Sequence, residues 1–406
     1  MRRENGNIII QKYGGSSVES PERLKEVARR IIQCKEAGDH IVVVVSAMGN
    51  TTDELIELAH RISPVPARRE LDMLLSVGER ISMTLLSMAI NDLGHKAISF
   101  TGSQSGIITD ERHTNARIVE VRASRILEEL EKDKVVIVAG YQGVSRSKEV
   151  TTLGRGGSDT TAIALAAALG ARVCEIYTDV DGVYTADPGL VKDAKKHTRL
   201  SYDEMLSLSA AGGTILKKDA MEFAKSRGIR VVIRSSFSED PGTEIGMVEG
   251  GVTSQVIAVT QQLDLVALLF DGMKTREKIL EFIRDLNKEG IEVRDFILDC
   301  SDAETVADHL FLAISASHEF ERNYVENAAK RLLAGHGHRL FECGSVSIVA
   351  SADSYLPELY CRILQLLQAY KIRTYGMKKE FAAITAYIER KDAETALSIL
   401  HRELVQ

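Results

Sequence analysis

The sequence predicts an α/β protein in which an open, mainly parallel sheet is sandwiched by helices and followed by two small α+β units. Over the first 245 residues, short runs rich in β-branched residues alternate with longer amphipathic stretches, the pattern of strand–helix units. Beyond them the order strand–helix–strand occurs twice. These two observations predict the fold class.

Six apolar runs of strand length are the candidate strands of the first part. Each is bounded by polar or turn-forming residues, and each is followed by a loop or a helical stretch. They lie at Ile8–Gln11, Ile41–Val45, Ala97–Phe100, Val135–Ala139, Val173–Thr178 and Val231–Ser235.

Three helices are expected between these strands. The first begins at Ser20 and Pro21, because serine caps a helix start and proline suits its first position, and it runs to about Lys35. Apolar residues at helical spacing predict a second helix over residues 70–91. An alanine-rich stretch predicts a third over Thr160–Leu169.

Turn-forming residues cluster between Pro241 and Gly251 and mark the first domain boundary. We expect a first domain over residues 1–246 and two small α+β domains over residues 247–340 and 341–406. A strand at residues 256–260 is a candidate partner of the last domain. The other elements expected here are Leu263–Phe270, Thr275–Lys288, Ile291–Leu298, Ser345–Ala350, Leu356–Tyr370 and Ile372–Tyr375.

The composition excludes several classes of partner. Fifty-one basic and 58 acidic residues give a net charge of −7, and no basic run suits nucleic acid or a lipid surface. No apolar run reaches the ~20 residues of a membrane span, and the first residues lack a signal sequence. The five cysteines are dispersed, which favours neither disulfides nor a metal site. We expect a cytoplasmic protein without a protein-bound metal.

Three glycine-rich loops follow predicted strands and are candidate anion sites, because their backbone N–H groups can face oxygen atoms. The first contains Lys12, Gly14, Gly15 and Ser16, and its lysine would stabilise a migrating phosphoryl group. A structural Gly-Gly turn is the alternative here. The second loop, Ser46–Thr52, follows a fully apolar strand at the end where open α/β sheets bind ligands.

The third loop, residues 152–159, is the most specific of the three. It combines three glycines with Arg155, Ser158 and Asp159 directly before a helix. It matches neither a Walker loop nor a G-x-G-x-x-G fingerprint. Arginine binds a carboxylate in a planar fork, and an acidic side chain meets an ammonium group, which together describe an amino-acid site. A tight turn capped by Ser158 or Asp159 is the alternative.

The first 245 residues resemble the aspartate kinase family, with its motifs in order and at its spacing. The stretches that carry the resemblance are QKYGGSS, VVVVSAMGNTTDEL, ELDMLLSVGERIS, FTGSQSGIITDERHTNARI, VAGYQGV, TTLGRGGSDTTAIALAAALGA, EIYTDVDGVYTADP and VVIRSSFSEDPGTEI. The resemblance implies an amino-acid-kinase-type sheet followed by two ACT-like regulatory domains.

The resemblance also implies a reaction and its participants. The family phosphorylates the side-chain carboxylate of L-aspartate with ATP and Mg²⁺, the first step toward lysine and threonine. A carboxylate is already ionised at neutral pH, so the reaction needs no general base. Homodimerisation through the ACT-like domains is expected.

Residue roles carry over by position in the motifs. Lys12 and Asp159 would be catalytic, with Lys12, Gly14, Gly15 and Ser16 at the phosphates. The resemblance places Ser46, Thr52, Glu79, Arg155 and Ser158 at the aspartate, and Thr178, Asp179, Asp181 and Tyr184 at the nucleotide. Without the resemblance, Asp179 and Asp181 equally suit a simple Asp-Gly turn.

Three positions depart from the family pattern on the ATP side. Gly189 and Asp219 stand where the family has arginines, and Thr214 stands where it has a lysine. Compensation by the neighbouring Lys217 or Lys218 is one hypothesis. The other is a weakened, regulatory or specialised paralogue with an altered ATP site.

Overall fold

The structure is a computed structural model that describes residues 8–154, 156–212, 216–247, 255–271, 276–289, 291–299, 309–316, 319–335 and 337–405. The chain forms two compact units. Unit 1 comprises residues 1–183, 196–206 and 214–249, and unit 2 comprises residues 184–195, 207–213 and 250–406.

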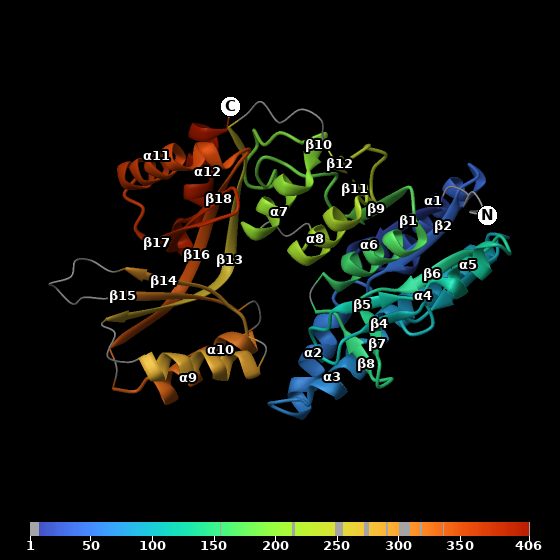
Figure 1. Cartoon of the computed structure of the whole chain (residues 1–406), viewed down its shortest axis with the longest axis horizontal. Coiled ribbons are helices and arrows are strands. Elements are labelled where there is room, and N and C mark those ends of the chain that lie inside the picture. Colours follow the sequence, from blue (N-terminus) through green and yellow to red (C-terminus); the bar gives the residue numbers. More distant parts are fainter. Residues whose placement is uncertain are drawn as a thin grey trace. The chain divides into compact units, whose positions relative to one another are not determined.

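Unit 1 is built on an open sheet of eight strands in the order β10-β12-β11-β9-β1-β2-β6-β3 (Figure 1). Neighbouring strands are parallel except β11 and β12. The strands are β1 Ile8–Tyr13, β2 His40–Val45, β3 Ala97–Phe100, β6 Val135–Ala139, β9 Val173–Thr178, β10 Arg199–Ser201, β11 Val231–Ser235 and β12 Thr243–Gly246. The predicted fold class and all six predicted strands are confirmed.

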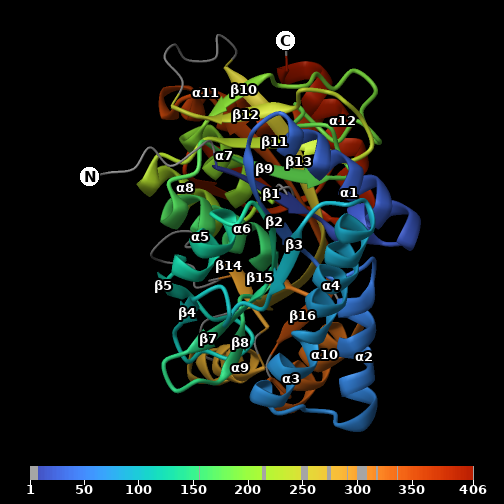
Figure 2. The ribbon, with the colours of Figure 1, turned by 90° about the vertical axis from the view of Figure 1, so that its right-hand side faces the viewer.

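Helices cover both faces of this sheet, which is why its central strands are buried and apolar. Helices α1 Pro21–Glu36 and α4 Val77–Asp92 lie on one face, and α6 Gly157–Leu169 and α8 Lys218–Arg227 lie on the other (Figure 2). The predicted start of α1 is confirmed, since the Ser20 side chain accepts a hydrogen bond from the Arg23 N–H.

The single helix predicted over residues 70–91 is interrupted at one residue. The structure has α3 Arg68–Leu75 and then α4, with Ser76 between them. The Gln142 side-chain amide donates to the Ser76 carbonyl at 2.8 Å, which gives this oxygen a partner outside the helix. Periodicity continues across the break, so the sequence does not reveal it.

Residues 68–92 together are long and apolar enough to span a membrane, which the sequence analysis did not anticipate. However, 44% of the apolar window is already buried inside unit 1. Met83, Leu86 and Ile90 of α4 belong to the core between the helix and the sheet. Core packing therefore accounts for the apolar residues on one face of this segment. Other large apolar side chains of the segment are exposed, namely Met73, Val77, Ile81, Leu85 and Met88.

A small sheet in the order β5-β4-β7-β8 extends unit 1 and leads into the third glycine loop. Its last strand, β8, ends at Thr152, directly before the loop. The elements not yet named in unit 1 are β4 Ile107–Thr109, β5 Ile118–Val121, β7 Gln142–Ser145, β8 Val150–Thr152, η1 Gly15–Val18, α2 Thr51–Ile62, α5 Ser124–Leu130 and α7 Tyr202–Ala210, which passes into unit 2.

Unit 2 holds two α+β halves on one antiparallel sheet in the order β14-β15-β13-β16-β18-β17. Its strands are β13 Val256–Asp271, β14 Val293–Asp299, β15 His309–Ser315, β16 His338–Ala350, β17 Thr374–Glu380 and β18 Ala383–Glu389. Its helices are α9 Arg276–Lys288, α10 Glu319–Leu332, α11 Leu356–Ala369 and α12 Ala393–Leu404, with short η2 Asp353–Tyr355 and η3 Arg390–Asp392. The expected α+β class of this region is confirmed.

The long strands β13 and β16 run through both halves of unit 2. Residues 256–262 of β13 pair with residues 345–350 of β16, and the later part of β13 also pairs with β15. Unit 2 in addition contains residues 184–195, which precede the predicted domain boundary. The boundaries near residues 246 and 340 remain predictions.

Candidate active site

The first two glycine loops meet because the central parallel strands that precede them end in register. Tyr13 at the end of β1 lies beside Val45 of β2 and Tyr177 of β9, and Val45 lies beside Ala139 of β6. The carboxyl ends of these strands therefore form one edge, where open α/β sheets bind ligands.

The first and second loops pack directly against each other at this edge. The Ser46 N–H donates to the Tyr13 carbonyl at 3.0 Å, and the Gly49 N–H donates to the Gly15 carbonyl at 3.1 Å. A Cβ at Gly15 would lie 3.0 Å from the Ala47 carbonyl oxygen. Glycine is required there because two main chains approach closely.

A buried ion pair joins the first loop to the third. Lys12 Nζ lies 2.7 Å from Asp159 Oδ1. The two residues are only 8% and 6% exposed. Because an unpaired charge is expensive to bury, each side chain holds the other at the sheet edge. The predicted catalytic pair is thus brought together.

Ser158, beside Asp159, is buried against the backbone of Gly140. A Cβ at Gly140 would lie 2.6 Å from Ser158 Oγ and 2.9 Å from the Val45 carbonyl oxygen. Gly140 was not among the predicted site residues. The signal was present, since this glycine directly follows the apolar run of β6.

Glu79, in the first turn of α4, carries a carboxylate that is 3% exposed. Its Oε1 accepts a hydrogen bond from the Ala47 N–H at 3.1 Å, whereas its Oε2 is buried without a hydrogen-bond partner among the described residues. Burial raises the pKa of Glu79 to about 7, against the opposing effect of backbone hydrogen bonds. A buried carboxylate oxygen of this kind suits a cationic group of a ligand.

The loop after β9 lies at the same edge. The Thr178 hydroxyl donates to Asp179 Oδ1 at 2.9 Å, and the Ser236 N–H donates to the Thr178 carbonyl at 3.0 Å. Asp181 lies 3.3 Å from the ammonium group of Lys196. This edge thus carries both acidic and basic groups, and Lys196 was not predicted.

The remaining predicted residues fall into two groups. Ser16, Ser46 and Thr52 are half-buried in or directly after the first two loops. Arg155 lies outside the described residues, and Tyr184 belongs to unit 2.

Two of the three departures on the ATP side are described. Gly189 and Asp219 are both exposed, whereas Thr214 lies outside the described residues. The stem of Lys217 packs on the third loop, since a Cβ at Gly156 would lie 2.8 Å from its Cγ. This lysine, rather than Asp219, is therefore next to the site.

Fold and site together define a class: an α/β protein whose loops at the carboxyl edge of a parallel sheet suit an anion and an amino acid. A family model described as "Amino acid kinase family" matches residues 7–235. A full-length relative, the aspartokinase of Corynebacterium glutamicum, is 42% identical over 98% of this chain and 96% of its own length. The chain therefore belongs to the amino acid kinase family and, within it, to the aspartokinases.

Other aspartokinases are similar to the chain as well. The aspartokinase of Geobacillus stearothermophilus is 40% identical over 97% of this chain and 96% of its own. That of Corynebacterium efficiens is 59% identical over 59% of this chain, a match that spans 57% of the relative. Among solved structures, Escherichia coli aspartokinase III in complex with aspartate and ADP has a TM-score of 0.77 and 21% identity, covering 98% of this chain and 100% of that one. It shares the fold.

Proposed function

We propose that the chain is an aspartate kinase that transfers the γ-phosphoryl group of ATP to the side-chain carboxylate of L-aspartate, forming 4-phospho-L-aspartate. The observation that carries the proposal is the ion pair of 2.7 Å between Lys12 and Asp159. It joins the loop suited to phosphate to the loop suited to an amino acid. The full-length aspartokinase relatives support the same activity, and the alternative of a weakened paralogue is not favoured.

Aspartate would bind between the third loop and α4. Arg155 holds its α-carboxylate, and Glu79 Oε2 accepts from its ammonium group, because Asp159 is already paired with Lys12. The hydroxyl groups of Ser46, Thr52 and Ser158 border the same space. The side-chain carboxylate is then left to point at the phosphoryl group.

The phosphates would lie over the first loop. Backbone N–H groups of Gly15 and Ser16 would face the phosphate oxygens, next to Gly14, whose own N–H donates to the Tyr177 carbonyl at 3.0 Å. Lys12 would neutralise the charge that develops during transfer. Because the acceptor carboxylate is ionised, catalysis consists of positioning and charge stabilisation rather than proton removal.

The nucleotide would extend along the loop after β9, past Thr178, Asp179 and Asp181. Mg²⁺ fits this edge as a companion of ATP, since it is usually held by phosphate oxygens with one or two carboxylates. Within the described parts of the chain, no group of three or more His, Cys, Asp or Glu side chains is arranged to hold a metal ion by itself. When bound, Mg²⁺ supplies charge neutralisation at the β- and γ-phosphates.

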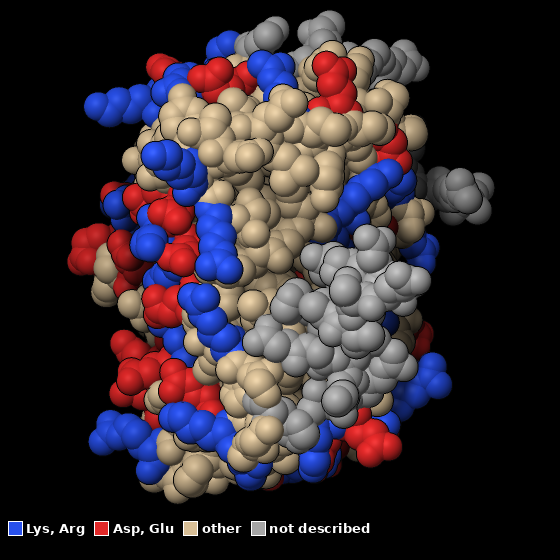
Figure 3. Space-filling view, turned by 90° about the vertical axis from the view of Figure 1, so that its left-hand side faces the viewer, with Lys and Arg blue, Asp and Glu red and all other residues tan. Residues whose placement is uncertain are grey.

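We also propose a cytoplasmic homodimer formed through unit 2. The side of the molecule that carries α11 and β17 in Figure 1 shows a broad uncharged area bordered by charged side chains (Figure 3). Exposed apolar side chains of unit 2 include Tyr360, Leu364 and Phe296. Such surfaces favour association between copies. Sedimentation of the purified chain as a monomer at micromolar concentration would contradict the dimer.

Hydroxamate formation from ATP, Mg²⁺, L-aspartate and hydroxylamine tests the activity directly. The wild-type chain should form aspartyl hydroxamate, whereas Lys12→Ala should lose at least a hundredfold in kcat with little change in aspartate binding. Aspartate binding without hydroxamate formation by the wild type would instead identify a non-catalytic paralogue.

A further inference from the structure

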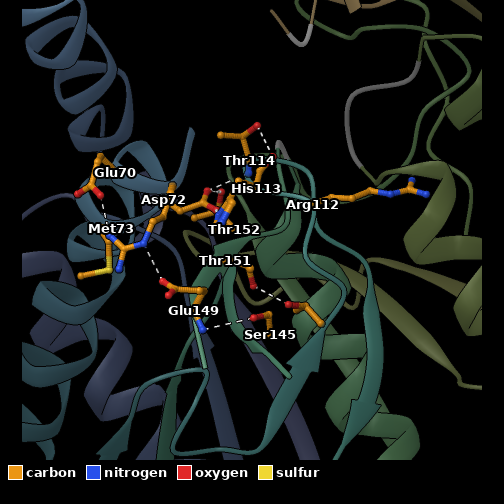
Figure 4. Close-up of polar contacts among 12 residues, drawn as sticks. Glu70, Asp72, Met73, Arg112, His113, Thr114, Ser145, Glu149, Thr151 and Thr152 are labelled. Carbon is orange, nitrogen blue, oxygen red and sulfur yellow. Dashed lines mark hydrogen bonds and ion pairs between the residues drawn. The ribbon is translucent and has the colours of Figure 1, made fainter. Parts of the chain in front are cut away.

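A second buried carboxylate lies outside the proposed substrate contacts. Asp72 in α3 is 0% exposed, and three groups surround its oxygen atoms (Figure 4). His113 Nδ1 lies 2.6 Å from Oδ2, while the Thr114 N–H and the Thr152 hydroxyl donate to Oδ1 at 3.0 and 2.5 Å. These contacts fix the position of the Asp72 carboxylate more closely than packing of the side chain alone would.

The partners of Asp72 lead directly into the third loop. Thr152 is the last residue of β8, and its carbonyl accepts from the Ala116 N–H at 2.9 Å. Two residues later, Gly154 has a φ of +69°, and a Cβ there would lie 3.0 Å from Asn115 Oδ1 and 3.2 Å from the Thr114 carbonyl oxygen. The segment around residue 114 thus packs closely against the third loop. Asp72 accepts hydrogen bonds from both, through the Thr114 N–H and the Thr152 hydroxyl.

Asp72 also stands on the helix that leads to Glu79. One turn after Asp72 the chain breaks at Ser76, where the Gln142 amide holds the carbonyl, and α4 then begins with Glu79 in its first turn. One carboxylate therefore connects the third loop to the helix that leads to the start of α4, the two segments between which aspartate is proposed to bind.

We propose that Asp72 is a positioning residue for aspartate binding: through Thr152, Thr114 and His113 it holds the third loop at a fixed distance from the helix that carries Glu79. This inference rests on the proposed function. A purely structural anchor would stabilise the fold without discriminating between the two substrates. Substitution of a positioning residue, in contrast, lowers the affinity for aspartate and leaves the affinity for ATP unchanged.

Asp72→Asn keeps the size of the side chain and leaves one oxygen to accept from Thr114 and Thr152, but it removes the negative charge and places an amide N–H₂ opposite His113 Nδ1. We expect the KM for aspartate to rise about 10- to 100-fold, with the KM for ATP within about twofold. Thr152→Val, a milder change in case Asp72→Asn folds poorly, should raise the KM for aspartate about 3- to 10-fold. Hydrogen–deuterium exchange over residues 151–160 should be faster in both variants.

Glu129→Gln is the matched control, because Glu129 on α5 is also a buried carboxylate and pairs with Lys132 and Lys134, which follow the helix. Its KM values and its exchange over residues 151–160 should equal those of the wild type. Equal rises in both KM values, or unchanged exchange in Asp72→Asn and Thr152→Val, would overturn the positioning role. If the wild type formed no hydroxamate, the proposed function would fail, and the exchange measurement would still decide whether Asp72 holds the third loop in place.

Discussion

Lys217 is a positively charged residue that lies next to the third loop, on the side of the site where ATP is expected. The family pattern has a lysine at position 214 and an arginine at position 219, where this chain has threonine and aspartate. Asp219 is exposed in the first turn of α8, whereas the stem of Lys217 packs on Gly156 of the third loop. We therefore infer that the lysine that precedes α8 restores part of the lost positive charge.

Replacing each of the two neighbouring lysines by alanine in turn tests whether Lys217 compensates for the missing charges. Lys217→Ala should raise the KM for ATP about 10- to 100-fold, because a charge-assisted contact with phosphate is worth roughly 1.5–3 kcal/mol. Lys218→Ala is the control, because it removes the same charge from the neighbouring residue, while the atoms nearest to a Cβ at Gly156 all belong to Lys217. It should change the KM for ATP less than threefold. Steady-state kinetics with ATP as the varied substrate gives both values, and equal effects would argue against a specific role for Lys217.

Glu79 makes aspartate binding depend on pH. Burial raises its pKa from 4.5 to about 7, so the carboxyl is largely protonated below pH 7 and accepts poorly from an ammonium group. The KM for aspartate should fall as the pH rises from about 6 to about 8, with an inflection near 7. Glu79→Gln should show a high KM without this inflection. Wild-type KM values that are flat across this range would contradict the ammonium contact.

The same shift has a consequence for stability in the ligand-free chain. The unfolded chain releases the Glu79 proton near pH 4.5, while the native chain retains it up to about pH 7, so native stability falls as the pH rises between these values. Glu79→Gln should therefore stabilise the ligand-free chain above pH 7, by up to about 3 kcal/mol, and change little below pH 4.5. Urea unfolding at the two pH values measures the difference.

At the scale of elements, the site depends on close packing between strand ends. Gly140 follows β6 and touches both the end of β2 and the first turn of α6. Gly140→Ala should displace Ser158, raise the KM for aspartate and lower stability by about 1–3 kcal/mol. Gly246→Ala is the control, because a Cβ there meets nothing within 4 Å, and should remain within about 0.5 kcal/mol of the wild type.

Elements with local signals could be predicted from the sequence. The start of α1 depends on Ser20 and Pro21, and the end of α6 depends on Gly170, which adopts a φ of +62°. Both signals act within one helical turn. The first two glycine loops were found for the same reason, since they directly follow the apolar strands β1 and β2.

Features that depend on distant residues could not be predicted in this way. The break at Ser76 involves Gln142, 66 positions away, and the partners of Asp72 lie 41 to 80 positions away. In unit 2, the strands β15 and β18 and the helices α10 and α12 were missed. The strands β15 and β18 pair with β13 and β16, and these two long strands belong to both halves of unit 2. The repeat of strand, helix and strand is therefore obscured in the sequence.

At the scale of the whole molecule, unit 2 includes a segment of the nucleotide motif. Thr185, next to the predicted nucleotide residue Tyr184, accepts at its carbonyl from the Val259 N–H of β13 at 2.8 Å. Its hydroxyl lies 2.9 Å from Nε2 of His401 on α12, and both side chains are buried. A change in the packing of α12 can therefore reach the residue beside Tyr184 through one hydrogen bond.

His401→Leu tests whether this hydrogen bond matters for ATP. The variant leaves a buried hydroxyl with one partner fewer, so we expect a loss of about 1–3 kcal/mol and a severalfold rise in the KM for ATP, with the KM for aspartate unchanged. His95→Leu is the control, because His95 is partly exposed beside Glu36, and both KM values should stay at the wild-type level. A destabilised His401→Leu with wild-type KM for ATP would show that Thr185 and His401 only stabilise unit 2, and that the nucleotide edge is independent of α12.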